Sequence, residues 1–230
     1  MAALRCLAHK NNVQSSRTSN TRAEKTFSAV PFIGYLANEL PMLYAYLGDV
    51  AFNKIADEYV STNYRKRENA NFLGTQLPQF LQASQSFAHN PEIFELASFE
   101  VAINKAFVAP ETCFATSLEF EPSEQQSKRI TFVESAQVLL FNQNTTSIWA
   151  ALKCEEKPPR PHRLDEPQHV LVWRQRGASR FRILGEEEAN LFQHFAKKAK
   201  QKPILEKSDV QRTSNYLRSW LDAELVACAV

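Results

Sequence analysis

The sequence predicts an α+β protein, with an N-terminal helical bundle domain followed by a smaller mixed domain that has a β-sheet or hairpin with flanking helices. Between residues 30 and 109 the apolar residues recur with the period of an α-helix. After Pro110 the pattern changes to short alternating or β-branched segments, and two helical stretches close the chain. We therefore predict a helical domain over residues 1–112 and an α+β domain over residues 113–230.

Proline and glycine divide the helical half. Residues 11–28 are polar and lack apolar periodicity, so we expect a flexible segment that links a short N-terminal helix to the bundle. In "FIGYLANELPMLYAYLG", Pro41 divides or kinks the helix and Gly48 stands where a helix ends. Asp49 is the predicted cap of the next helix. Two more helices follow, in "FLGTQLPQFLQASQSF" and, opened by Asn90, in "PEIFELASFEVAINKAFVA".

The C-terminal half mixes strands and helices. The proline-rich stretch 155–168 is expected to be irregular, and a hairpin that turns at Gly177 follows it. Helices are predicted in "NTTSIWAAL", in "GEEEANLFQHFAKKAKQK", whose first turn is acidic, and in "SDVQRTSNYLRSWLDAELVA". Strands are predicted in "TSLEF", "RITFV", "QVLLF" and the two arms of the hairpin, "HVLVWRQ" and "ASRFRIL".

Composition excludes several classes of function. The chain has 230 residues, 44% hydrophobic and 23% charged, with a net charge of +2, which argues against a dedicated nucleic-acid binder. Its five glycines do not form a phosphate-binding loop. The four scattered cysteines form no metal or redox pair, so free thiols are expected. Without a secretory signal or a long apolar run, the sequence predicts a cytoplasmic protein.

The sequence contains no recognisable catalytic or metal motif. None of its five histidines has a metal-ligand spacing, and no cofactor is predicted for this chain. Glu100 lies among apolar residues, and we interpret it as half of a structural ion pair with a lysine or arginine of the bundle. The alternative is a tuned acid or base. An enzyme built from distant residues would centre on Glu100, His169 and His194.

The strand "HVLVWR" is apolar on both faces, with Val170 and Val172 on one side and Leu171 and Trp173 on the other. Either helices of this chain cover both faces, or a partner covers the second face or extends the sheet. Four arginines crowd the bend of the hairpin. They suit phosphates or the rim of a protein-binding surface, and the near-neutral net charge favours the rim. These arginines are Arg174, Arg176, Arg180 and Arg182.

Several segments resemble those of the HvfC/BufC N-terminal family and follow one another in the same order. Members of this family were once labelled as DNA-binding proteins. The resemblance is carried by Leu40-Pro41, Leu47-Gly48 and Phe52, by the segment from Gly74 to Leu81, and by Phe99-Glu100-Val101. In the second half, "SIWAAL" and "EPQHVLVWRQRGASRFRIL" are similar to the Ile-Trp and His-Leu-Val-Trp-Arg segments of longer members. The resemblance spans roughly residues 30–225.

The resemblance implies a non-catalytic partner subunit. It would form a heterodimer with a TIM-barrel multi-iron oxygenase that modifies cysteines of a ribosomally made precursor peptide, as in methanobactin-type oxazolone and thioamide formation. Iron would belong to the partner enzyme. The C-terminal domain would bind the leader peptide, which we predict pairs as an added strand. The candidate contacts are Val138, Leu140, Val170, Leu171, Val172, Trp173, Arg174, Arg180, Phe181 and Arg182.

Two other functions remain open at this point. A DNA-binding transcriptional regulator would agree with the old family label and with the helical N-terminal half. A partner subunit for a different cysteine-modified peptide would share the same motifs. No membrane partner is predicted.

Overall fold

The computed structural model describes residues 30–63, 74–115, 130–196 and 207–228. Within these ranges the chain forms seven α-helices and a three-stranded antiparallel sheet, which confirms the predicted α+β class and the helical N-terminal region. The helices are α1 (Val30–Glu39), α2 (Pro41–Asn63), α3 (Leu77–Ala83), α4 (Pro91–Val108), α5 (Thr145–Lys153), α6 (Glu186–Ala196) and α7 (Lys207–Asp222). The strands are β1 (Gln137–Gln143), β2 (Arg163–Gln175) and β3 (Ala178–Leu184).

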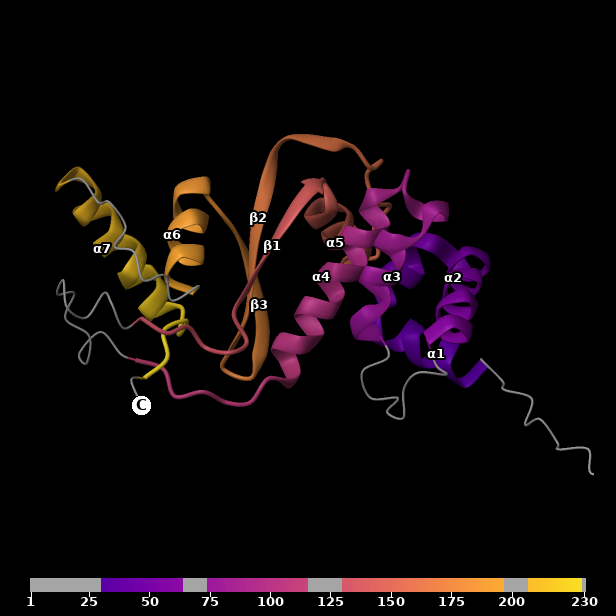
Figure 1. Cartoon of the computed structure of the whole chain (residues 1–230), viewed down its shortest axis with the longest axis horizontal. Coiled ribbons are helices and arrows are strands. Elements are labelled where there is room, and N and C mark those ends of the chain that lie inside the picture. The colour runs from indigo at the N-terminus through magenta and orange to yellow at the C-terminus, as the bar shows by residue number, and fades with distance from the viewer. Residues whose placement is uncertain (1–29, 64–73, 116–129, 197–206, 229–230) are drawn as a thin grey trace, which may run out of the picture.

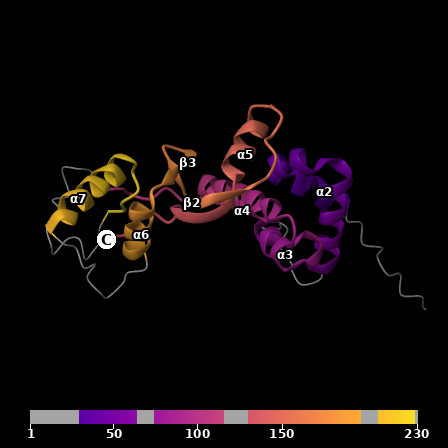
Figure 2. The same ribbon diagram turned by 90° about the horizontal axis from the view of Figure 1, so that it is seen from above.

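The elements follow one another along the long axis of the molecule. Figure 1 shows α1, α2 and α3 at one end, with α4 running from them to the sheet, and α6 and α7 on the other side of the sheet. Figure 2, seen from above, shows the same order, with α5 beside α4 at the middle. The sheet therefore lies between two sets of helices.

Both predicted breaks in the first helical stretch are confirmed. Helix α1 ends at Glu39 and α2 begins at Pro41. Within α2, Gly48 has φ 70° and ψ 170°, which interrupts the helical backbone. Residues other than glycine almost never adopt this combination of φ and ψ. The chain can therefore bend here only because residue 48 is a glycine.

Helix α4 has two buried faces. Ile93, Leu96 and Val101 belong to the core of the helical bundle, whereas Phe99 and Ala102 pack on the sheet with Val170 and Val172. Helix α5 extends the bundle core, since Ile148 lies in it and Trp149 also contacts the cluster on the sheet. Contacts thus cross the boundary that we predicted at residue 113, and that division stays a prediction.

Strand β2 is the central strand and pairs with β1 on one side and β3 on the other. Its residues Val170 and Val172 face α4, and Leu171 and Trp173 face a second cluster formed with α6 and α7. Helices of this chain therefore cover both faces. The alternative in which a partner covers the second face is wrong.

The proline-rich stretch was predicted to be irregular throughout, but β2 begins within it, at Arg163. Pairing with β1 is irregular between Phe141 and Gln143, and it resumes at Gln143 opposite Arg163. Pro167 is tolerated because its nitrogen faces the β3 side, where β3 has already ended at Leu184.

Other strand predictions fare differently. "RITFV" forms an isolated bridge, Phe132 with Val226, instead of a strand. "TSLEF", the short N-terminal helix and the segment 11–28 lie outside the described residues. None of the helices among the described residues has the length and apolar character that would let it cross a membrane.

The prediction that all cysteines are free thiols is wrong for Cys113 and Cys228, which form a disulfide with a Cα–Cα distance of 5.5 Å. The two residues are 115 positions apart in the sequence, so no local spacing pattern could reveal the pair. Cys154 is free and exposed.

We predict that Gly48→Ala lowers the free energy of unfolding by roughly 1–3 kcal/mol, because alanine is strained at φ 70° and ψ 170°. Gly34→Ala is the matched control. Gly34 lies on the exposed side of α1 with no atom near an added Cβ, so alanine should be neutral or stabilise by up to about 1 kcal/mol. Urea unfolding of both variants checks this, and equal effects would contradict the assigned backbone conformation.

Candidate functional site

The four residues of β2 that we predicted to contact a peptide are buried in the central strand. Val170, Leu171 and Val172 are fully buried, and Trp173 is 6% exposed. Main-chain groups on both sides of β2 are already used by β1 and β3. The prediction is therefore wrong for these four residues, which serve the core, and only β1 and β3 have outer edges.

The bend of the hairpin is a two-residue turn with positive φ at both central positions, 51° at Arg176 and 77° at Gly177. This is the pattern of a type I′ turn, whose twist suits a tight hairpin. Asparagine and glycine are the usual residues at the first position. Here the Nε atom of Arg176 donates to Glu224 Oε1 at 2.9 Å, which favours this backbone conformation from outside the turn.

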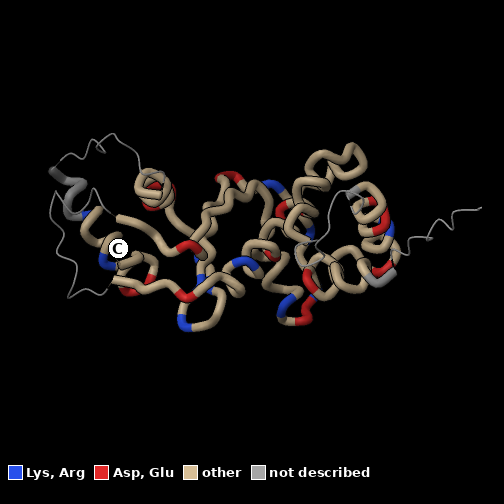
Figure 3. Tube along the Cα trace, turned by 60° about the horizontal axis from the view of Figure 1, so that its bottom comes forward, with Lys and Arg blue, Asp and Glu red and all other residues tan. Residues whose placement is uncertain are grey.

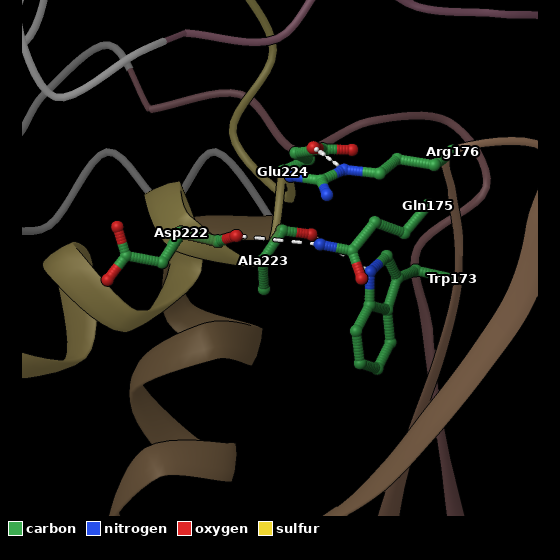
Figure 4. A network of polar contacts seen from close by, with 6 residues as sticks. All are labelled: Trp173, Gln175, Arg176, Asp222, Ala223 and Glu224. Atoms are coloured by element: carbon green, nitrogen blue, oxygen red, sulfur yellow. Dashed lines mark hydrogen bonds and ion pairs between the residues drawn. The ribbon is translucent and has the colours of Figure 1, made fainter.

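The same bend is attached to the chain that follows α7, as Figure 4 shows. Trp173 Nε1 donates to the carbonyl of Ala223 at 2.9 Å, and Gln175 Nε2 donates to that of Asp222 at 3.5 Å. Together with the Arg176–Glu224 pair, these bonds fix three positions of the hairpin to one short segment.

The other arginines of the hairpin also have internal partners, with one exception. Arg174 donates to the carbonyl of Ala109 and lies 3.7 Å from a carboxylate oxygen of Glu111. Arg182 forms a two-pronged ion pair with buried Glu188 of α6. Arg180 is exposed and makes no ion pair with a described residue. Arg174 and Arg182, both predicted to contact a peptide, are thus held by the fold.

Glu188 belongs to the acidic first turn that the sequence predicted for this helix, but it is buried. Its side chain is 7% exposed and also accepts a hydrogen bond from Trp220 Nε1 at 2.8 Å. Burial of this carboxylate explains why Arg182 turns towards α6.

The turn fixes which residues of β3 have free main-chain groups. Gln175 and Ala178 flank the two-residue turn and bond to each other, so hydrogen bonds to β2 come from alternate residues of β3. Ser179, Phe181 and Ile183 then direct their N–H and C=O groups outward. No further strand pairs with this edge among the described residues.

The side chains of this edge differ between its two faces. Phe181 is 37% exposed and Ile183 is 50% exposed, and both point to the α4 face of the sheet. The ring of Phe181 makes edge contacts with Phe99 and Trp149, at centroid distances of 5.0 and 5.5 Å. The opposite face carries Arg180 and Arg182. The β3 edge is thus apolar on one side and polar on the other.

The outer edge of β1 is shorter. By the same alternation Val138, Leu140 and Asn142 direct their main chain outward, but the Asn142 N–H donates to Glu95 Oε1 at 2.8 Å. Val138 is half-buried in the cluster with α6 and α7, and Leu140 is 51% exposed. Of the predicted contacts, Val138, Leu140, Arg180 and Phe181 remain at open edges.

Glu100 supports helix α2 and does not form the predicted ion pair. Its two carboxylate oxygens accept hydrogen bonds from the N–H groups of Met42 and Leu43, at 2.9 and 2.8 Å. These groups belong to the first turn of α2, which lacks partners within its own helix. Burial raises the pKa of Glu100 from 4.5 to about 7, although the two N–H groups and the positive charge of Lys153 act in the opposite direction.

The residues of the proposed convergent enzyme site are not brought together around Glu100. Its carboxylate faces α2, whereas His169 points to the face of the sheet that is turned away from α4. His194 lies on α6, where its ring contacts Phe195. The described part of the chain contains no group of three or more histidine, cysteine or acidic side chains that could hold a metal ion.

No family model matches this sequence, and no curated protein is similar to it. Membership of the HvfC/BufC N-terminal family therefore stays a prediction.

We predict that ionisation of Glu100 makes the folded protein less stable as pH rises. The folded pKa lies above the unfolded one, so the folded state binds the proton more tightly, and this contribution is lost between about pH 4.5 and pH 7. The free energy of unfolding of the wild type, relative to Glu100→Gln, should fall by up to about 3 kcal/mol over that range.

Urea unfolding at pH 5 and pH 8 measures this difference. Glu156→Gln, which removes an exposed carboxylate, serves as the matched control. A difference between wild type and Glu100→Gln that is the same at both pH values would contradict the prediction.

Proposed function

We propose that this chain is a non-catalytic, peptide-recognising subunit that receives an extended peptide as a fourth strand on the outer edge of β3. The observation that carries the proposal is this edge, with outward main-chain groups at Ser179, Phe181 and Ile183 and two half-exposed apolar side chains beside them. An open strand edge binds a peptide through main-chain hydrogen bonds, and pockets for alternate side chains give specificity.

The β3 edge is a better acceptor than the β1 edge. It has three outward residues in alternate positions, whereas Glu95 already occupies one outward N–H group of β1. A strand added to β3 would place every second side chain next to Phe181 and Ile183. Its remaining side chains would lie beside Arg180, which makes no ion pair with any residue that the structure describes.

The nature of the partner follows from the family resemblance. In that reading the chain forms a heterodimer with a TIM-barrel multi-iron oxygenase in the cytoplasm, and the bound segment is the leader of a precursor peptide. The partner would hold the iron and modify the cysteines of the core peptide, with the methanobactin-type oxazolone and thioamide as one product. A sister pathway with another cysteine-containing peptide would use the same edge.

A DNA-binding regulator has less support. Three of the four arginines at the hairpin bend are paired with carboxylates of this chain, which reduces the positive charge that phosphates would meet there. Figure 3 shows lysines and arginines interspersed with acidic residues along the described chain and not gathered on one element. If the chain did bind DNA, its affinity would fall steeply with salt, whereas strand addition depends on salt weakly.

We predict that Ile183→Pro weakens peptide binding at least about tenfold, because proline removes an outward N–H group that β2 does not use. Leu140→Pro, which removes an outward N–H group of β1, is the matched control and should leave the affinity unchanged. The probe is the N-terminal half of a small cysteine-containing precursor peptide, which the proposal requires to be encoded beside this gene. Fluorescence anisotropy gives the affinity, and circular dichroism checks that both variants are folded.

The outcomes separate the two edges and the function itself. Loss of affinity in Leu140→Pro alone would move the site to β1. Full affinity in both folded variants would overturn strand addition. The proposal also requires an iron oxygenase encoded beside this gene. Co-expression with that enzyme tests the other half of the proposal, and absence of such a gene or failure of the two chains to co-purify would overturn the partner-subunit role.

A further inference from the structure

The C-terminal segment of the chain is held between two stretches that are distant in sequence. Ala115 N–H donates to the carbonyl of Val226 at 2.8 Å, and Ala227 N–H donates to that of Thr131 at 2.8 Å. Beyond these bonds, Cys228 N–H donates to the carbonyl of Cys113 at 2.9 Å, and the two cysteines form the disulfide. The disulfide therefore joins the segment after α7 to the segment after α4.

The bend of the β2–β3 hairpin is bound to both of these segments. Arg174 reaches Ala109 and Glu111 in the segment after α4. Trp173, Gln175 and Arg176 reach residues 222–224, the last residue of α7 and the two that follow it. Residues 173–176 of the hairpin thus form polar contacts with two segments, and the Cys113–Cys228 disulfide links these segments to each other.

We propose that Cys113 and Cys228 form a redox-sensitive clasp that closes the two segments around the bend of the hairpin. The thiols are accessible to small reagents, because Cys113 is exposed and Cys228 is only half-buried. A dithiol reductant opens the clasp by thiol–disulfide exchange. The sulfur–sulfur bond breaks, Cys113 and Cys228 become two thiols by gaining two electrons and two protons, and the reductant becomes a disulfide.

Opening the clasp leaves the main-chain hydrogen bonds of the segment in place but removes its covalent link. A crosslink that closes a loop of more than a hundred residues strongly restricts the separation of its ends, so its loss lets the two segments part more often. The bend loses its external partners each time they part. The clasp therefore controls how long the hairpin stays in one conformation.

The consequence for peptide binding rests on the proposed function. The outward residues of β3 begin at Ser179, two positions after the turn, and Ser179 Oγ also donates to the carbonyl of Ile103 at 2.7 Å. A loosened bend makes the start of this edge less ordered. Reduction should then weaken the binding of an added strand, because ordering the edge takes part of the binding free energy.

The first measurement is a thiol count on the full chain after air oxidation, with the chain denatured in the absence of reductant. The chain has four cysteines, so a closed clasp leaves two titratable thiols, and a dithiol reductant restores four. Cys154→Ser removes the exposed free cysteine and should lower each count by one. Four thiols in the oxidised sample would overturn the proposal.

The second measurement is amide hydrogen exchange of the hairpin bend and of residues 225–228, with the clasp closed and open. We expect exchange to become about tenfold faster or more on reduction, and in Cys113→Ser under oxidising conditions. Cys154→Ser is the matched control and should exchange like the wild type. Unchanged exchange in the reduced wild type would overturn the role of the disulfide as a clasp.

Peptide affinity, measured on the same samples, separates the clasp from the proposed function. Faster exchange together with weaker binding supports both. Faster exchange with unchanged affinity supports the clasp and overturns its control of the β3 edge. If the oxidised protein does not bind the peptide at all, the proposed function fails, while the thiol counts and exchange rates still decide the clasp.

Discussion

The two-sided packing of helix α4 is the constraint on which the other contacts depend. One face of the helix forms the bundle core, and the other covers the sheet, so neither set of elements would have a complete core without it. Its buried carboxylates connect the rest. Glu100 caps the first turn of α2, and Glu95 accepts from the N–H groups of Asn142 and Gln143 and from the hydroxyl of Thr145, where β1 leads into α5. A buried carboxylate is tolerated when it accepts several hydrogen bonds, and here each one positions another element.

The hairpin shows why residue type alone did not reveal the site. Arginine at a bend is common in binding surfaces, and the sequence predicted such a surface. In the fold, Arg174 and Arg176 have carboxylate partners from distant parts of the chain, and Arg182 pairs with the nearby Glu188. These pairs hold the bend and α6. The open surface is instead the neighbouring edge of β3. The peptide binding that we propose for this edge depends on main-chain groups, which do not differ with side-chain type except at proline. Only the strand order shows which of these groups are free.

Local signals in the sequence were sufficient for most of the elements. Gly48 and Pro41 marked the breaks of the first helices. The helical spacing of apolar residues predicted α4 and its end near Ala109. Nonlocal features were not predictable in the same way. The central position of β2, the disulfide between Cys113 and Cys228, and the burial of Glu188 all depend on which distant segments meet. The proline at position 167 misled the prediction because its effect depends on whether a neighbouring strand is still present beside it.

The charges on β3 bear on what kind of strand its open edge would accept under the proposed function. An open edge with apolar side chains invites pairing between two copies of the same chain, and natural proteins oppose this with charged residues on the edge. Consider two copies whose β3 strands pair antiparallel about a two-fold axis, with Phe181 opposite Phe181. Residues before the centre then lie opposite residues after it, so Arg180 of one copy lies opposite Arg182 of the other. Pairing centred one residue earlier would set Arg180 against Arg180. Like charges directly opposite each other destabilise a sheet, so the arginines of β3 oppose pairing between two copies of this chain. They do not oppose an added strand that has no basic residues opposite them.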